Sequence, residues 1–445
     1  MITVAVLGVA GYLGLAIAAE GPLGGAGYWL MLGLGATVLA AGSLLAWRAP
    51  PRTMLLVILI AGGAMRLVLV PLDPALSTDT YRYLWDGRVQ AAGINPYVHA
   101  PEDEALADLR DDAVWPNINR SFARTIYPPV AQVTFLAAEV TGIRSPVTWK
   151  GLTATVDIAA MLLLVWALRA AGRDERWVVA YAWNPLPIMA FGLTGHVDAL
   201  VVLAVMGATL LWWRGRPAWT GALLGVAAAV KLFPLMLVAA YARGRDGTWR
   251  WKEAAIVAGA AVGVLTVSYL PYAGAGSDVL GFLSTGYLDE EGYLDLSRYR
   301  LLRTIGLDGR IVAPLLGAGV GIAVLASRRP APTRGAWLLG AALVLTTPYS
   351  WYATPLVALA AAGGAGWAWG WFAIALHAAY ISIFHDQVLE PVTGGMRLST
   401  PLRVTSAGAL VTLAALAVRW PRARRAVLWQ PPARQRDRDR EGLAP

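Results

Sequence analysis

Apolar runs long enough to cross the hydrocarbon core of a bilayer recur along almost the whole chain, and they constrain its fold most. Of the 445 residues, 57% are hydrophobic and only 15% are charged, whereas soluble domains carry about a quarter charged residues. Such long apolar runs satisfy their backbone hydrogen bonds in a bilayer by forming helices. The sequence therefore predicts an all-α polytopic membrane protein.

The number of predicted spans is about eleven to fourteen. The first run lacks the basic start and cleavage site of a secretory signal, so it is expected to remain as a span. Prolines interrupt 218–242 and 336–363, which are each expected to form two short helices. The stretch 128–142 is expected to be a juxtamembrane or re-entrant helix. The predicted spans are 1–19, 28–47, 53–72, 151–169, 177–193, 197–213, 218–242, 254–273, 311–327, 336–363, 366–384 and 403–418.

Arginine and lysine residues concentrate in three short loops, 48–52, 243–252 and 328–334, and in the tail after Arg419. The positive-inside rule makes these segments cytoplasmic in a cell membrane. The extracytoplasmic segments are then 73–127, 194–196, 274–310 and 386–402. This distribution, with possible attraction to anionic lipid, accounts for the net charge of +9 and gives no indication of nucleic-acid binding.

Residues 1–430 are expected to form a single multi-span domain, and 431–445 are expected to form a disordered polar cytoplasmic tail. The chain has no cysteine, which excludes disulfides and thiolate chemistry. No His and carboxylate pair has the spacing of a zinc site, so no metal ligand is predicted. His377 and His385 are expected to be packing or interface residues.

The loop 73–127 is too long for a simple connector and carries candidate catalytic residues. If 79–92 is helical, Asp79 and Asp86 lie two turns apart on one face with Arg82 between them. The alternative is a solvated surface helix capped at its first residues. The aromatic residues expected at the membrane interface are Tyr81, Tyr83 and Trp85.

Polar residues within or beside the apolar spans are a second group of candidates, because they are costly in a membrane unless they serve a site. Asp157 interrupts a span, and His196, Asp198 and Lys231 lie at the outer turns of two helical hairpins. Each has a structural alternative. Asp157 could pair with Lys150, His196 or Asp198 could cap the following helix, and Lys231 could extend to the interface.

Three strings in the long loop resemble the first extracytoplasmic loop of GT-C-type glycosyltransferases. They are TDTYRYLWDG at 78–87, GINPY at 93–97 and YPP at 127–129. The pattern is similar to that of bacterial polyprenol-phosphate-mannose-dependent mannosyltransferases, glycosyltransferase family 87 and its relatives. It is also similar to the eukaryotic mannosyltransferase of GPI-anchor synthesis. Further strings that resemble the bacterial group are AWNP at 182–185, GHVD at 195–198 and KLFP at 231–234.

The resemblance implies a GT-C-like bundle that transfers a hexose, with mannose favoured, from a polyprenyl-phosphate donor to an extracytoplasmic glycan or glycolipid. Asp79 would be the base for the acceptor hydroxyl, with Asp86 as the alternate. A single base favours inverting displacement. The residues expected to bind the donor phosphate are Arg82, His196, Lys231 and Arg303. Those expected to bind substrate are Tyr81, Trp85, Asn95, Tyr97, Tyr127, Asp157 and Asp198.

One departure concerns the acidic motif, because several relatives have paired acids where this chain has Thr78-Asp79-Thr80. The sequence requires no cofactor, and whether the protein uses a divalent cation such as Mg²⁺ or Mn²⁺ stays open.

Two other functions stay open at this stage. A transporter or flippase would use Asp157 and Lys231 as gating charges, although no internal repeat is visible. An O-antigen ligase or polymerase would depend instead on Arg298, Arg300 and Arg303.

Overall fold

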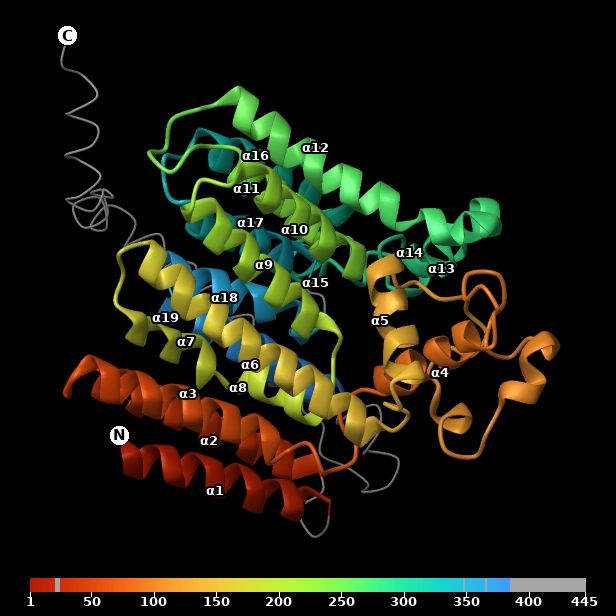
Figure 1. The fold of residues 1–445 in the computed structure, drawn as a ribbon, viewed down its shortest axis with the longest axis horizontal. Helices are drawn as coiled ribbons and strands as arrows, with labels where there is room; N and C mark the ends of the chain where they lie inside the picture. The colour runs from red at the N-terminus through yellow and green to blue at the C-terminus, as the bar shows by residue number, and fades with distance from the viewer. Residues whose placement is uncertain (21–24, 347–348, 365, 385–445) are drawn as a thin grey trace.

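The computed structural model describes residues 1–20, 25–346, 349–364 and 366–384, and its regular structure in these ranges is helical. The all-α class predicted from the apolar runs is confirmed. Figure 1 shows most of the longer helices side by side in a bundle, with a smaller helical region at one end. The longer helices are α1 (Ile2–Ala19), α2 (Gly25–Leu45), α3 (Pro51–Leu67), α6 (Pro146–Ala170), α9 (Asp198–Trp213), α10 (Pro217–Val230), α12 (Trp251–Ser268), α16 (Gly309–Ala326), α17 (Ala331–Thr346), α18 (Thr354–Gly363) and α19 (Gly366–Phe384).

Five of the described helices are long and apolar enough to cross a membrane. They are α1, α2, α6, α12 and α16. These five helices make the chain a multi-pass membrane protein. Several of the other predicted spans are divided among shorter apolar helices, so the number of spans stays a prediction. The predicted span 403–418, the outer segment 386–402, the tail 431–445 and His385 lie outside the described residues.

Proline explains where the bundle helices break. Both 218–242 and 336–363 contain separate helices, as predicted: α10 is followed by η5 (Phe233–Leu237) and α11 (Val238–Tyr241), and α17 by η7 (Ser350–Ala353) and α18. The predicted span at 177–193 is not one continuous helix. That stretch is divided into η3 (Glu175–Val178), α7 (Val179–Ala182), α8 (Pro185–Ile188) and a π-helical turn, η4 (Met189–Leu193). Pro185 and Pro187 lack the backbone N–H that a continuous helix needs.

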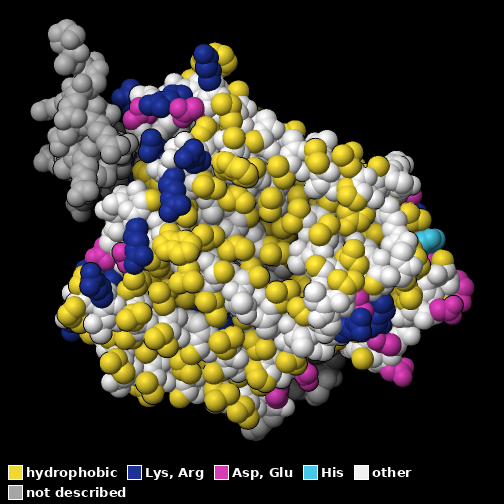
Figure 2. All heavy atoms as spheres, viewed as in Figure 1, with side chains coloured by type: hydrophobic (Ala, Val, Ile, Leu, Met, Phe, Trp, Pro, Cys, Tyr) yellow, Lys and Arg dark blue, Asp and Glu magenta, His cyan; other side chains and the backbone are white. Residues whose placement is uncertain are grey.

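The two ends of the bundle differ in charge. Figure 2 shows Lys and Arg side chains gathered at the end where α1 begins, and Asp and Glu more frequent near the opposite end. This polarity agrees with the loop charges that predict a cytoplasmic and an extracytoplasmic end.

The long loop forms the smaller helical region at the other end of the bundle (Figure 1). It contains α4 (Asp79–Ala91), which confirms the predicted helix, and two short 3-10 turns, η1 (Glu104–Leu109) and η2 (Trp115–Asn117). The chain then enters α5 (Pro129–Val140), the helix predicted at 128–142.

The interface position predicted for two aromatic residues of α4 is wrong. Tyr83 and Trp85 are buried inside the loop region. The Tyr83 ring stacks on Phe135 of α5 with a centroid separation of 4.9 Å, and Trp85 packs on Trp115 at 5.4 Å. Gly87 lets the two helices approach, because a Cβ there would lie 2.4 Å from the Phe135 carbonyl oxygen. This side of α4 faces α5 rather than lipid.

A buried ion pair joins α3 and α6 in the core of the bundle. Asp157 of α6 pairs with Arg66 of α3, and both side chains are fully buried. Tyr181 also donates a hydrogen bond to Asp157. The predicted alternative, a pair between Asp157 and Lys150, is wrong. Lys150 donates instead to backbone carbonyls at the end of α3, including that of Leu69 at 3.5 Å.

Candidate functional site

A cavity of about 600 Å³ lies where the long loop meets the end of the bundle. It combines acidic, basic and aromatic side chains from parts of the chain that are far apart in sequence. Its walls are formed by the ends of α1 and α2, residues 73–79, Asn119, Arg120, Ile126, Tyr127, Lys231, Tyr287, Glu291, Tyr349, Trp351, Tyr352 and Tyr380.

Asp79 is the first residue of α4 and lines this cavity. Its side chain is 16% exposed. Asn119 donates a hydrogen bond of 2.7 Å to Oδ1 of Asp79, while Oδ2 lies 3.6 Å from Nδ1 of His196. Asp79 is therefore an oriented carboxylate with access to the cavity, which is the geometry a general base needs.

His196 lies behind Asp79 in a tight turn between η4 and α9. Gly195 has a φ of +72°, and a Cβ there would lie 2.8 Å from the Lys150 side chain. Thr80 ties the start of α4 to this turn by donating to the Thr194 carbonyl at 2.8 Å. Burial lowers the pKa of the His196 imidazole well below its usual range, and the nearby charge of Lys231 lowers it further. The imidazole is therefore neutral and lies beside Asp79, outside the cavity lining, at a distance longer than a hydrogen bond.

Lys231 is the first residue after α10, which ends at Val230. This position at the helix end places its cationic side chain in the cavity lining. Its Nζ lies 2.7 Å from Oδ2 of Asp198 and 4.4 Å from the centre of the Tyr352 ring. The Asp198 side chain is fully buried. An ammonium group carries three donors, so the bond to Asp198 leaves donor capacity for an anion in the cavity.

One wall of the cavity is aromatic and is formed largely by Tyr349, Trp351 and Tyr352, from the segment between α17 and α18. Tyr349 and Trp351 stack with ring centroids 4.8 Å apart. Trp351 also stacks on the His196 ring, with centroids 3.7 Å apart. Tyr380 packs edge-on against Trp351, with centroids 5.1 Å apart. These contacts fix the wall against the turn that supports Asp79.

A second set of charges joins the long loop to the 287–299 segment. Glu291 accepts hydrogen bonds from Arg120 at 3.0 Å, Arg298 at 2.7 Å and the Tyr349 hydroxyl at 3.0 Å. The Glu291 side chain is almost fully buried. Arg120 follows Asn119 and has a positive φ of 49°, so this cluster fixes the strained backbone beside the residue that orients Asp79.

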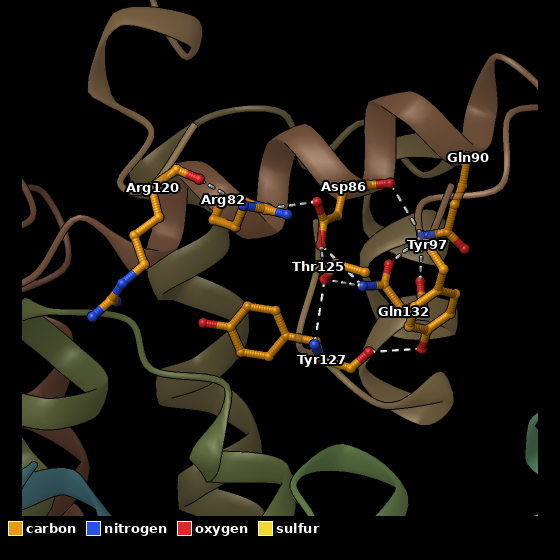
Figure 3. A network of polar contacts seen from close by, with 8 residues as sticks. All are labelled: Arg82, Asp86, Gln90, Tyr97, Arg120, Thr125, Tyr127 and Gln132. Atoms are coloured by element: carbon orange, nitrogen blue, oxygen red, sulfur yellow. Dashed lines mark hydrogen bonds and ion pairs between the residues drawn. The ribbon is translucent and has the colours of Figure 1, made fainter. Parts of the chain in front are cut away.

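Asp86, the predicted alternate base, does not line the cavity. Its side chain is buried, and Arg82 donates to Oδ1 at 2.9 Å. Thr125 and Gln132 donate to Oδ2 at 2.6 and 2.9 Å. Figure 3 shows this network, with the Tyr127 ring pointing away from it. Asp86 and Arg82 therefore hold the loop together, with their polar groups already engaged.

The remaining predicted residues occupy different places. Tyr127 lines the cavity, and Tyr97 donates to its carbonyl oxygen at 2.7 Å. Asn95 donates to the backbone of Tyr272 at 3.3 Å. These contacts give Asn95 and Tyr97 roles in loop packing. The predicted residues that lie outside the cavity lining are Tyr81, Arg82, Trp85, Asp86, Asn95, Tyr97, Asp157, His196, Asp198 and Arg303.

Several cavity residues were not predicted. Asn119 and Arg120 lie in a polar part of the loop without helical periodicity, and Glu291 lies in a run of three acidic residues, 289–291. The clearest available signal was the aromatic run Tyr349-Ser350-Trp351-Tyr352, which follows a proline at a break in a long apolar stretch. Within the described residues, no group of three or more His, Asp or Glu side chains could hold a metal ion.

The bundle and its cavity define a multi-pass membrane protein with a polar, aromatic-walled site at one end of the helices. The family model MptA_B, described as alpha-(1->6)-mannopyranosyltransferase, N-terminal domain, matches residues 9–244, which is more than half of the chain. The chain belongs to this family of mannosyltransferases and is a glycosyltransferase. The resemblance to GT-C mannosyltransferases is thereby confirmed. Comparisons with curated proteins and with solved structures give no significant match.

Proposed function

We propose that this protein transfers mannose from a polyprenyl-phosphate-linked donor to a glycan or glycolipid acceptor on the extracytoplasmic side of the cell membrane. The observation that carries the proposal is one cavity that Asp79 and Lys231 both line. Both residues fall inside the 9–244 segment matched by the mannosyltransferase family. The loop charges favour the extracytoplasmic side for the end of the bundle that holds this cavity.

Asp79 is the proposed general base. A sugar hydroxyl is a weak nucleophile until a base accepts its proton as it attacks. Asp79 suits this role because Asn119 holds one of its carboxylate oxygens and the side chain still reaches the cavity. The acceptor oxygen forms a bond to C1 of mannose while the bond from C1 to the phosphate oxygen breaks.

Lys231 is the proposed partner of the leaving polyprenyl phosphate. The phosphate gains one negative charge as the glycosidic bond breaks, and a preorganised cation stabilises that charge. The pair with Asp198 and the Tyr352 ring hold the ammonium group in place before the donor arrives. Because Asp79 accepts the proton and the phosphate leaves with the bonding electrons, the reaction needs no covalent enzyme intermediate and inverts C1.

The proposal is tested by transfer of radiolabelled mannose from polyprenyl-phosphate-mannose in membranes that contain matched amounts of each variant. Asp79→Asn is expected to lower transfer by about 100- to 10,000-fold, the usual contribution of a general base. Asp73→Asn is the matched control, because Asp73 is an exposed acid of the same cavity. Lys231→Gln is expected to lower transfer from the same donor.

Full activity of Asp79→Asn would show that another group is the base, and Asp86→Asn would be measured next. Transfer only from a nucleotide-linked mannose would refute the lipid-linked donor. The configuration of the product at C1 tests inversion separately.

A further inference from the structure

A second groove, of about 620 Å³, lies at the end of the bundle opposite to the mannosyl-transfer cavity. It lies where α3 begins and α6 ends. Since α6 has 25 residues, roughly 37 Å of helix separates this groove from the end at which α6 starts. The groove is lined by residues 51, 52, 55 and 56 of α3 and by residues 169 and 173–175.

The groove carries uncompensated positive charge. Arg169 forms a two-point ion pair with Glu175, with N–O distances of 2.6 and 2.7 Å. Asp174 is likewise engaged by Arg176, at 2.5 Å. Both acids of the groove are therefore neutralised by neighbouring arginines. Among the described residues, Arg52 and Arg173 form no ion pair with a carboxylate.

Arg173 is held at the groove by the surrounding fold. Its guanidinium lies beside Gly364, where a Cβ would approach it to 2.0 Å, so the glycine leaves space for the arginine. Burial lowers the pKa of Arg173, because the guanidinium is partly desolvated without a carboxylate to compensate. A ligand with a negative charge would supply that compensation.

Apolar side chains continue from the groove along both helices. On α3, Leu56 and Ile60 are 60% and 71% exposed and follow Arg52 at four-residue intervals. Leu162 and Trp166 of α6 are also exposed, on the approach to Arg169. Residues four apart lie on one face of a helix. Each helix thus has a basic end and an exposed apolar face next to it. The basic end is complementary to an anionic phospholipid headgroup, and the apolar face is complementary to its acyl chains.

We propose that this groove binds the phosphodiester headgroup of an anionic membrane phospholipid, with the acyl chains along α3 and α6. Basic pockets between membrane helices at the cytoplasmic side are suited to anionic headgroups. The donor of the transfer reaction is a different ligand, because its proposed cavity lies at the other end of the bundle. The lipid site would stabilise the fold independently of mannose transfer.

The test titrates the purified full chain in detergent with phosphatidylglycerol or phosphatidylcholine of identical acyl chains. Lipid occupancy is measured by native mass spectrometry and stability by thermal unfolding. The wild type is expected to bind phosphatidylglycerol more tightly than phosphatidylcholine. Only phosphatidylglycerol should raise its thermal stability. Each arginine near the headgroup contributes about fivefold in affinity. Arg52→Gln with Arg173→Gln should therefore weaken phosphatidylglycerol binding by roughly 25-fold.

Arg214→Gln is the matched control, because Arg214 is an exposed arginine at the end of α9, outside the groove. It should bind phosphatidylglycerol as the wild type does. Arg52→Gln alone keeps the test valid if the Arg173 change disturbs folding, because Arg52 is exposed. Equal binding of both lipids by the wild type, or unchanged phosphatidylglycerol binding by Arg52→Gln, would overturn the proposal.

Discussion

The buried pair between Arg66 and Asp157 gives the sharpest prediction about stability. Asp157→Asn keeps the side-chain volume but removes the negative charge, which leaves the Arg66 guanidinium buried without its counter-ion. Arg66 would keep its hydrogen bonds of 2.8 Å to the carbonyls of Gly62 and Ala182. Loss of one member of a buried ion pair costs about 3–5 kcal/mol. We therefore expect Asp157→Asn to lower the free energy of unfolding by about that amount.

The double variant Arg66→Met with Asp157→Leu separates the charge effect from packing. Replacing both members of a buried pair by apolar residues is often neutral or stabilising, so this variant should recover most of the lost stability. Unfolding free energies would be measured by denaturant titration of the purified protein in a fixed detergent. A change below about 1 kcal/mol in Asp157→Asn would refute the reasoning, since that is the range of exposed pairs.

The same variants test the predicted role of Asp157 in substrate binding. If the residue is structural, the folded double variant should transfer mannose at close to the wild-type rate per molecule. A stable double variant without transfer activity would instead support a direct role of Asp157 with the substrate.

The other predictions concern the cavity and the residues beside it. Because the pKa of His196 is lowered in the folded state, the unfolded state binds more protons near its ordinary value of about 6.5. Thermal stability should fall as the pH drops through that value, and His196→Gln should reduce the decrease. Glu291→Gln should lower the turnover rate by up to about 100-fold through misplacement of the Asn119–Asp79 pair. Glu290→Gln, which loses a more exposed bridge to Arg120, should change it by less than about fivefold. Mannose transfer should persist in EDTA, and its loss with recovery in Mg²⁺ or Mn²⁺ would show a metal requirement.

The sequence determined the class of this protein and part of its site. Long apolar runs require helices in a membrane, and proline removes a backbone donor, so both the helical class and two of the helix breaks were predictable. The helix that begins at Asp79 and the family resemblance were also readable, because both depend on residues close together in the chain.

The tertiary structure decided which of these residues share a cavity. Both Asp79 and Asp86 are candidate bases in the sequence, with Asp79 favoured by the resemblance, yet only the structure shows that Asp86 is buried with Arg82 while Asp79 lines the cavity. Asp157 likewise pairs with Arg66 rather than with Lys150, its neighbour in sequence. Such choices depend on which helices pack together and which polar groups find partners when water is excluded, and local sequence patterns do not contain that information.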